Sequence, residues 1–246
     1  MAVGRTVVIT GAGMGLGRAV ARRLAQDGDT VILLARTLSK VQEAAAEIGG
    51  SAMAVACDVG SPDSVRAAFA EIAAKHPRID VLINNAAVYE PFTVAEATDE
   101  QILASLNPNF AGPIFCARAA IPMMERGGHI VNVSSESVAL DFPMLSLYQS
   151  SKAGLERFTE SLKRELLDDG IRVTTFRAGP MMDETKTGSN WDMEVAMRFH
   201  QACLKAAIDL RARPISHYNS VAQVLREVVN LPADVHLGVV TVEGWR

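Results

Sequence analysis

A short apolar run near the start of the chain leads directly into a cluster of glycines. The run Arg5–Thr10 is rich in β-branched residues and predicts a buried strand. Four glycines follow within residues 11–17, and a helical pattern continues through Val20 and Leu24. A strand, a glycine turn and a helix in this order direct backbone N–H groups and the positive end of a helix dipole at a pyrophosphate. The junction therefore predicts a dinucleotide-binding unit.

The spacing of the glycines defines the loop more closely. They do not fit Gly-x-Gly-x-x-Gly in any register, because counting from Gly13 the last position is Arg18. They fit Gly-x-x-x-Gly-x-Gly on Gly11, Gly15 and Gly17. A flexible turn without a ligand is the alternative, and four glycines at one strand–helix junction make it the weaker one.

Strand and helix patterns alternate along the rest of the chain. Strands are expected near residues 5–10, 30–35, 52–57, 79–84, 128–134, 171–176 and 237–242. Helices are expected near residues 16–27, 38–48, 62–75, 98–126, 147–168 and 219–229. This rhythm predicts a doubly wound, Rossmann-type parallel sheet of about seven strands with helices on both faces. Residues 1–246 are expected to form a single α/β domain, which suits a chain of this length with 49 % hydrophobic residues.

Composition argues against several other classes of protein. A formal net charge of −4 and the lack of a basic block give no sign of a nucleic-acid surface. The three cysteines form no Cys-x-x-Cys and the five histidines show no ligand spacing, so we expect free thiols and no metal site. No apolar stretch reaches the ~20 residues of a membrane helix, and no signal peptide precedes the first strand. We therefore expect a cytoplasmic protein with a small-molecule partner.

The end of the second predicted strand bears on the choice of dinucleotide. NAD sites usually place Asp or Glu here, where the carboxylate holds the ribose 2′-hydroxyl. This chain has Ala35-Arg36-Thr37 instead, with Arg36 nineteen residues past Gly17. A guanidinium suits a 2′-phosphate because it forms charge-assisted, bidentate hydrogen bonds. The sequence therefore favours NADP(H) over NAD(H), with a plain surface charge as the alternative.

A tyrosine and a lysine stand one helical turn apart in the predicted helix 147–168. Tyr148 and Lys152 are four residues apart and share one helical face, and Tyr148 lies thirteen residues after Ser135. A nearby cation favours the phenolate, so the pKa of Tyr148 is expected to fall from about 10 by roughly 1–3 units. Such a phenol could exchange a proton with an alcohol or ketone. Taken alone, the pair more often means a half-buried tyrosine beside a solvated lysine.

Together these motifs resemble the short-chain dehydrogenase/reductase family in its compact form, over almost the whole chain. The resemblance also rests on the segments Thr10–Gly17, Cys57–Val59, Asn84–Ala87, Asn109–Gly112 and Ile130–Ser135. It implies a catalytic set of Asn109, Ser135, Tyr148 and Lys152. It implies cofactor contacts from Gly11, Gly13, Met14, Gly15, Leu16, Gly17, Arg36, Thr37, Asp58, Val59, Asn85, Ala86, Ala87, Tyr148, Lys152, Gly179 and Met181.

The resemblance also implies a task for each catalytic residue. Ser135 would donate a hydrogen bond to the substrate oxygen as negative charge develops on it. Tyr148 would give that oxygen a proton in reduction or remove one in oxidation. Lys152 would lower the pKa of Tyr148 and bind the nicotinamide ribose. Asn109 would hold a water that links Lys152 to solvent, with Asn107 as the rival for that role.

The segment after the sixth strand departs from the family pattern. Compact members usually carry Pro-Gly there, with a threonine four residues beyond the glycine. Here Ala178 takes the proline position, Asp183 takes the threonine position, and Thr185 comes two residues late. Because this segment normally covers the cofactor, its contacts are in question, although Pro180 fixes its own φ.

Residues 181–217 are expected to cover the substrate. Trp191, Val195 and Phe199 recur at helical spacing, and a helix that packs this stripe on the core is favoured over a substrate wall. Further candidates for the pocket are Met181, Met182, Tyr89, Ser137 and Phe142. No Arg/Lys cluster marks this region, so an apolar or aromatic carbonyl compound is favoured over a sugar phosphate. Glu136, beside Ser135, has no assigned role.

The leading hypothesis is therefore an NADP(H)-dependent oxidoreductase that interconverts a ketone and a secondary alcohol. A catalytically silent NADP(H) sensor or interaction protein on the same fold is the alternative. Sugar-nucleotide epimerase or dehydratase chemistry fits poorly, because such relatives usually carry a longer C-terminal substrate domain. Relatives often pair their long helices, here 98–126 and 147–168, so the resemblance implies a homodimer or homotetramer.

Overall fold

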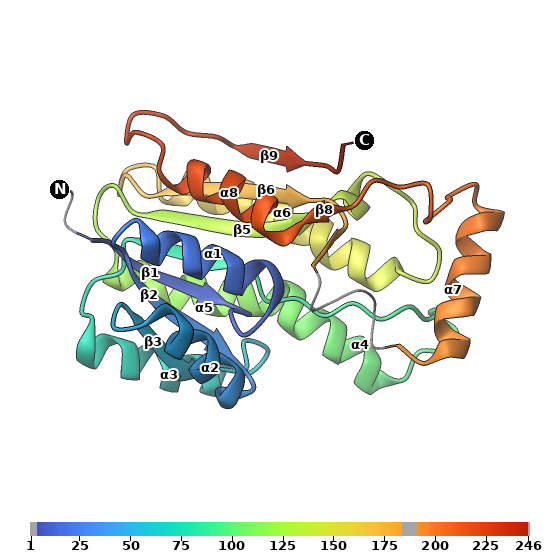
Figure 1. Ribbon diagram of the computed structural model, residues 1–246, viewed down its shortest axis with the longest axis horizontal. Helices are drawn as coiled ribbons and strands as arrows, with labels where there is room; N and C mark the ends of the chain where they lie inside the picture. Colours follow the sequence, from blue (N-terminus) through green and yellow to red (C-terminus); the bar gives the residue numbers. More distant parts are fainter. Residues whose placement is uncertain (1–3, 184–190, 246) are drawn as a thin grey trace.

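The computed structural model describes residues 4–183 and 191–245, and its centre is one parallel sheet of seven strands (Figure 1). The strand order is β3-β2-β1-β4-β5-β6-β9, and every neighbouring pair is parallel. The strands are β1 (Thr6–Thr10), β2 (Thr30–Ala35), β3 (Ala52–Ala56), β4 (Val81–Asn84), β5 (His129–Ser135), β6 (Arg172–Ala178) and β9 (Val239–Val242). The chain reverses direction across the sheet between β1 and β4, where doubly wound folds bind their ligands. The predicted fold class is confirmed.

Helices cover both faces of the sheet. They are α1 (Gly15–Gln26), α2 (Leu38–Ile48), α3 (Pro62–Lys75), α4 (Asp99–Leu106), α5 (Gly112–Ala120), α6 (Ser146–Glu165), α7 (Met193–Lys205) and α8 (Tyr218–Val229). Val7 and Ile9 of β1 pack with α1, α2 and α8, whereas Val8 packs with α3, α5 and α6. Because successive side chains of a strand point to opposite faces, a sheet covered on both sides needs continuous apolar strands. This explains the apolar runs in the sequence.

The termini of two predicted helices carry the expected caps. The Ser61 hydroxyl accepts a hydrogen bond from the backbone N–H of Ser64, with Pro62 as the first helical residue of α3. Thr98 and Gln101 form a reciprocal capping box at the start of α4. Each device satisfies backbone N–H groups that have no partner within the helix.

The single helix predicted for residues 98–126 is wrong. The segment is divided into α4, a π-helical turn at Asn107–Ala111, α5 and a 3₁₀ turn at Ile121–Met123. Pro108, Pro113 and Pro122 lie in these irregular turns or at their edges, and proline cannot donate the hydrogen bond that a regular helix requires. The other predicted boundaries shift by at most three residues.

Two short strands that the sequence did not predict lie beside the main sheet. β7 (Met181–Met182) pairs in parallel with β8 (Ser216–His217), and each has only two residues. Between them, α7 stands apart from the layered sheet at one end of the molecule (Figure 1). Phe199 of α7 is buried against Phe142 and Leu145 in a small separate apolar cluster. Helix α7 therefore packs with residues 142–145 in a small core that is separate from the two cores of the sheet.

Candidate active site

A cleft of about 810 Å³ opens at the carboxyl ends of the strands and contains most of the predicted site. Ser135 is the last residue of β5, and Tyr148 and Lys152 lie in the first turns of α6. All three line the cleft. The Lys152 Nζ lies 6.0 Å from the centre of the Tyr148 ring, and a hydrogen bond joins the Ser135 and Tyr148 side chains. The fold thus brings together the serine, phenol and ammonium groups that the sequence singled out.

Tyr148 and Lys152 differ in their exposure. Tyr148 is half-buried at the surface of the cleft, whereas Lys152 lies behind it with 2 % of its surface exposed. The Lys152 Nζ donates a hydrogen bond of 2.7 Å to the backbone oxygen of Val133 on β5. This bond holds the ammonium group inside the protein.

Burial controls the acidity of the pair. It raises the pKa of Tyr148 to about 12, although the hydrogen bond with Ser135 acts in the opposite direction. Burial also lowers the pKa of Lys152 to about 8. The predicted decrease in the pKa of Tyr148 is therefore wrong for the free protein, because removal from water penalises phenolate and ammonium alike. At neutral pH the phenol carries its proton.

Asn109 lies in the π-helical turn and is fully buried. Its Oδ1 accepts a hydrogen bond of 2.8 Å from the Val88 backbone N–H, and its Nδ2 donates one of 2.6 Å to the Val88 oxygen. Asn109 therefore fastens the turn to the loop after β4 and does not line the cleft. The rival Asn107 instead packs against Gly60.

The predicted cofactor residues converge on the same cleft. Its lining includes sixteen of them: Gly11, Gly13, Met14, Gly15, Leu16, Arg36, Thr37, Asp58, Val59, Asn85, Ala86, Ala87, Tyr148, Lys152, Gly179 and Met181. Gly17 does not line it; a side chain there would lie 2.6 Å from the Asn85 Nδ2 and from the Gly11 oxygen. Gly17 thus allows α1 to pack closely against the loops.

The loop after β4 supports the glycine loop through side-chain bonds. The Thr10 hydroxyl accepts hydrogen bonds of 3.0 Å from the backbone N–H groups of both Asn85 and Ala86. The Asn85 Nδ2 donates a bond of 2.9 Å to the Thr10 oxygen. Gly15, at the start of α1, has a φ of +56°, a conformation that favours glycine. These contacts fix the backbone that a pyrophosphate would meet.

Lys40 and Tyr218 are among the lining residues that the sequence analysis did not single out. Lys40 lies in the first turn of α2, and its Cβ is 3.0 Å from where a Gly13 side chain would begin. It adds a second cation to Arg36, and its place three residues after Thr37 was the available signal. Tyr218 begins α8, and its ring lies 3.4 Å from where a Gly15 side chain would begin. No local pattern points from Tyr218 to Gly15, because the contact is made only by the tertiary fold.

The segment that departs from the family pattern is held at both ends. The Gly179 N–H donates a hydrogen bond of 2.8 Å to the Val242 oxygen of β9. The Ser216 N–H donates one of 3.0 Å to the Pro180 oxygen, which continues into the pairing of β7 with β8. Ala178 is buried in β6. Thr185 lies outside the described residues.

Aromatic rings form one wall of the cleft next to Tyr148. The Tyr89 ring lies 5.6 Å from the Tyr148 ring and 5.1 Å from the Trp191 ring, and Trp191 meets Phe199 edge-on at 5.5 Å. The Trp191 Nε1 donates a hydrogen bond of 3.2 Å to the Tyr89 oxygen. Trp191 and Phe199, two of the three residues of the predicted stripe, therefore both pack in the small cluster and line the cleft.

A charged pair lies in this part of the cleft. The Arg213 Nη2 lies 2.5 Å from the Glu136 Oε2, and both residues line the cleft. The predicted pocket residues Met182, Ser137 and Phe142 line it too.

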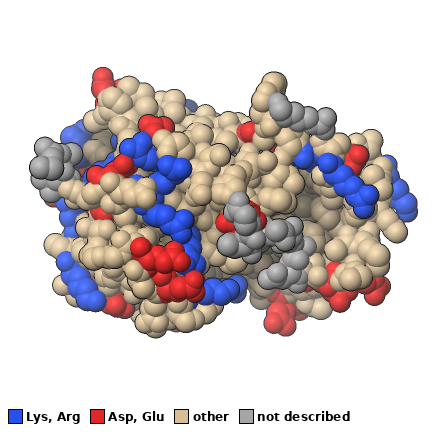
Figure 2. Space-filling view, viewed as in Figure 1, with Lys and Arg blue, Asp and Glu red and all other residues tan. Residues whose placement is uncertain are grey.

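Within the described chain, no group of three or more His, Cys, Asp or Glu side chains is placed to hold a metal ion. On the face seen in Figure 2, basic and acidic side chains are interspersed.

The amino-acid sequence matches a known protein family over most of its length. Residues 5–194 match the family described as short chain dehydrogenase. The chain belongs to this family. Within residues 4–183 and 191–245, no helix combines the length and apolar character that crossing a membrane requires.

Individual relatives have varied substrates. A 3beta-hydroxysteroid dehydrogenase of Mediterraneibacter gnavus is 36 % identical over 172 residues, which cover 68 % of this chain and 62 % of that protein. A D-xylose 1-dehydrogenase of Caulobacter vibrioides is 35 % identical over 193 residues, which cover 76 % of this chain and 75 % of that one. The match to the steroid enzyme thus spans less than two thirds of its length.

Solved structures of the family superimpose over nearly the whole chain. A short chain dehydrogenase from Burkholderia cenocepacia in complex with NADP has a TM-score of 0.82 and 28 % identity, covering 98 % of this chain and 96 % of that one. A metagenomic short-chain oxidoreductase in complex with NADP has a TM-score of 0.79 and 26 % identity, covering 99 % and 98 %.

Proposed function

We propose that this protein is an NADP(H)-dependent oxidoreductase that interconverts a ketone and a secondary alcohol on an apolar or aromatic small molecule. The observation that carries the proposal is the placement of Ser135, Tyr148 and Lys152 in the cleft that also contains the glycine loop. The carbonyl oxygen would lie between the Ser135 and Tyr148 hydroxyl groups, and the aromatic wall would receive the rest of the molecule.

The residues of the cleft suit a phosphorylated dinucleotide. Its pyrophosphate would meet the N-terminus of α1, where Gly15 adopts a left-handed φ and Gly17 allows close packing. Arg36 and Lys40 would hold the 2′-phosphate, since both cations line the cleft after β2. Lys152 would also bind the nicotinamide ribose. When bound, the nicotinamide supplies or accepts the hydride.

The protein's own groups would handle the proton. In reduction, Tyr148 would donate its proton to the carbonyl oxygen while Ser135 stabilises the developing charge with a hydrogen bond. Because the pKa of Tyr148 is raised to about 12, the phenol is in the donor form at neutral pH, which favours ketone reduction. Asn109 would contribute by positioning, through its two bonds to Val88.

Tyr148→Phe tests the proposal directly. The substitution removes the hydroxyl that transfers the proton and keeps the ring against Tyr89. We expect kcat for ketone reduction to fall by about 10²–10⁴-fold. NADPH binding, measured by fluorescence titration, should stay within about twofold of the parent, because a hydroxyl that acts mainly in the transition state adds little to ground-state binding.

Leu167→Ser, at an exposed position after the end of α6 that does not line the cleft, is the matched control and should retain parental kcat. Turnover that survives Tyr148→Phe would remove Tyr148 from the mechanism. Tight NADPH binding without activity on a broad panel of ketones and alcohols would support the sensor hypothesis instead.

The oligomeric state belongs to the same proposal. The helices α4, α5 and α6 correspond to the long helices that relatives pair, and Leu103 of α4 is 55 % exposed. We propose a homodimer or homotetramer. Sedimentation velocity of the purified protein tests this, and a single monomeric species at micromolar concentration would refute it.

A further inference from the structure

A second cavity lies behind the substrate end of the cleft. Its volume is about 650 Å³, and its lining combines the apolar residues Leu140 and Pro214 with the charged residues Arg177 and Glu243. Trp245 also lines it and is 95 % exposed, so this cavity is open to solvent. Glu136, Pro180 and Arg213 line both this cavity and the active-site cleft. The ion pair between Glu136 and Arg213 therefore stands on the boundary between the two spaces.

The ion pair is held firmly in this position. The side chains of Glu136 and Arg213 are only 14 % and 21 % exposed, and 2.5 Å separates their charged atoms. The Arg213 guanidinium also lies 5.1 Å from the centre of the Phe142 ring. Displacing one partner would leave the other charge buried without compensation, which is strongly unfavourable. A passing apolar chain offers no group that could replace either partner.

The space on the active-site side of this boundary is limited. The cleft has a volume of about 810 Å³ and extends from Arg36, at the expected 2′-phosphate position, to Phe199 on α7. The dinucleotide must share this volume with the substrate. Beyond Tyr148, a linear substrate would soon reach Glu136, which lies close enough for its charge to raise the pKa of Tyr148.

We propose that the Glu136–Arg213 ion pair is the end wall of the substrate pocket and limits the length of the substrate, so that removing the pair lets a longer chain continue into the second cavity. The inference rests on the proposed ketone chemistry. Both the pair and the cavity behind it are properties of this chain's own residues.

Binding in the cleft can be followed separately from turnover, because Trp191 lines the cleft. The probe is a short methyl ketone with a terminal bromine, which quenches a tryptophan that it touches. Titrations are made in the presence of NADP⁺, in the parent and in Glu136→Ser/Arg213→Ala, and unlabelled methyl ketones of increasing length then compete with the probe. Both proteins also carry Trp245→Phe, because Trp245 is 95 % exposed and would be quenched from solution.

We expect the short probe to quench Trp191 saturably in both proteins, and long ketones to displace it only in the double variant. In turnover assays, the ratio of kcat/KM for 2-dodecanone to that for 2-butanone should rise about tenfold or more, since each buried methylene contributes about fourfold. Equal displacement by long ketones in both proteins, or none in the double variant, would overturn the inference. Displacement as expected, with no ketone reduced by the parent, would refute only the proposed function.

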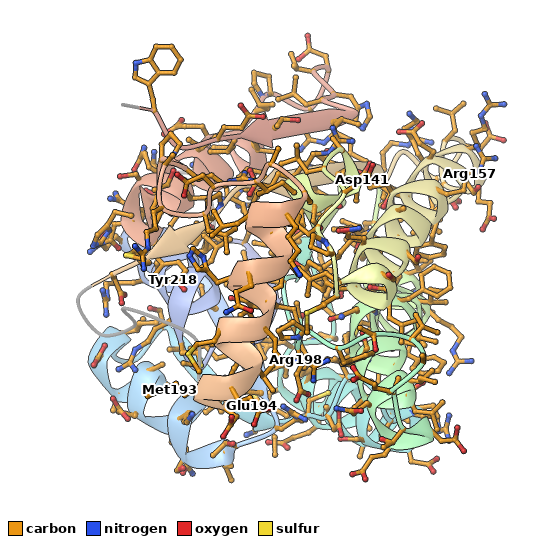
Figure 3. All side chains as sticks on the ribbon, turned by 90° about the vertical axis from the view of Figure 1, so that its right-hand side faces the viewer. Asp141, Arg157, Met193, Glu194, Arg198 and Tyr218 are labelled. Atoms are coloured by element: carbon orange, nitrogen blue, oxygen red, sulfur yellow. The ribbon has the colours of Figure 1, made fainter. Side chains whose placement is uncertain are left out.

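Two further variants separate size from charge. Glu136→Gln/Arg213→Met removes the charges but keeps the bulk, so the length limit should persist. Glu96→Ala/Arg198→Ala removes an exposed ion pair of 2.7 Å that lines neither cavity, and should leave the length profile unchanged (Figure 3 labels Arg198 on α7). If thermal unfolding shows that the small double variant does not fold, Glu136→Thr/Arg213→Leu takes its place.

Discussion

Replacing Lys152 with methionine should stabilise the protein at neutral pH while it impairs the site. Burial lowers the pKa of Lys152 from 10.5 to about 8, so holding the ammonium form inside the protein carries a free-energy cost. The difference of 2.5 units corresponds to about 3 kcal/mol at 1.36 kcal/mol per unit. The variant also loses the bond to the Val133 oxygen, worth about 1 kcal/mol. The expected net gain in the free energy of unfolding is about 2 kcal/mol at pH 7.

The pH dependence identifies the cause of this gain. Between about pH 8 and pH 10.5 the unfolded chain holds the Lys152 proton more tightly than the folded protein does, so the stability of the parent rises with pH across this window. Methionine cannot titrate, and the advantage of the variant should therefore shrink by about 2 kcal/mol between pH 7 and pH 9.5. Tyr148 is present in both proteins and does not contribute to the difference.

Urea unfolding of parent and Lys152→Met at both pH values measures this difference directly. Lys163→Met, which removes a lysine one third exposed on the same helix, is the matched control and should show no comparable change. A Lys152→Met protein that is less stable than the parent at pH 7, or whose advantage is the same at both pH values, would refute the reasoning.

Three further predictions concern the cleft. With saturating substrate, the rate of ketone reduction should change little between pH 6 and pH 8. The rate of alcohol oxidation should rise about tenfold per pH unit, because the phenolate fraction of Tyr148 grows at that rate below its pKa. Initial rates in both directions test this, and an oxidation rate that does not change with pH would contradict it. Arg36→Asp should weaken NADPH binding by about 10–100-fold through loss of a charge-assisted hydrogen bond. It should not weaken NADH binding, because a carboxylate at this position can hold the ribose 2′-hydroxyl. Lys40→Met should have a smaller effect, and an unchanged ratio of NADPH to NADH affinity in fluorescence titrations would exclude the 2′-phosphate contact. Gly15→Ala should lower the free energy of unfolding, measured in urea, by about 1–2 kcal/mol, because the φ of Gly15 is left-handed. Gly50→Ala, where a side chain would meet open space, should cause no such loss. Equal effects of the two substitutions would contradict the strain argument.

The sequence predicted the framework because its signals are local. The apolar runs of the sequence correspond to strands β1 to β6, and the glycine junction corresponds to the loop before α1. These elements were predictable because strand and turn preferences depend on neighbouring residues. The spacing between Ser135 and Tyr148 placed two side chains from different elements in one cleft, but that inference came from family resemblance and not from local physics.

The features that the sequence did not predict depend on tertiary environment. The pKa of Tyr148 moved opposite to expectation because sequence spacing reveals a neighbouring charge but not the extent of burial. Arg213 lies 77 residues from its partner Glu136, and no periodicity joins them. The pairs in β7 and β8 are too short to leave a pattern. In each case the decisive contact is made only after the chain has folded.

The burial of Tyr148 and Lys152 bears on the proposed proton transfer. If Tyr148 gave its proton to a substrate oxygen, the resulting phenolate would lie near the ammonium group of Lys152, whose pKa burial lowers. Movement of a proton from Lys152 to Tyr148 would leave both groups neutral in a region that disfavours charge. Under the proposed function, the enclosed lysine would therefore be a proton store that the folded chain carries beside its tyrosine.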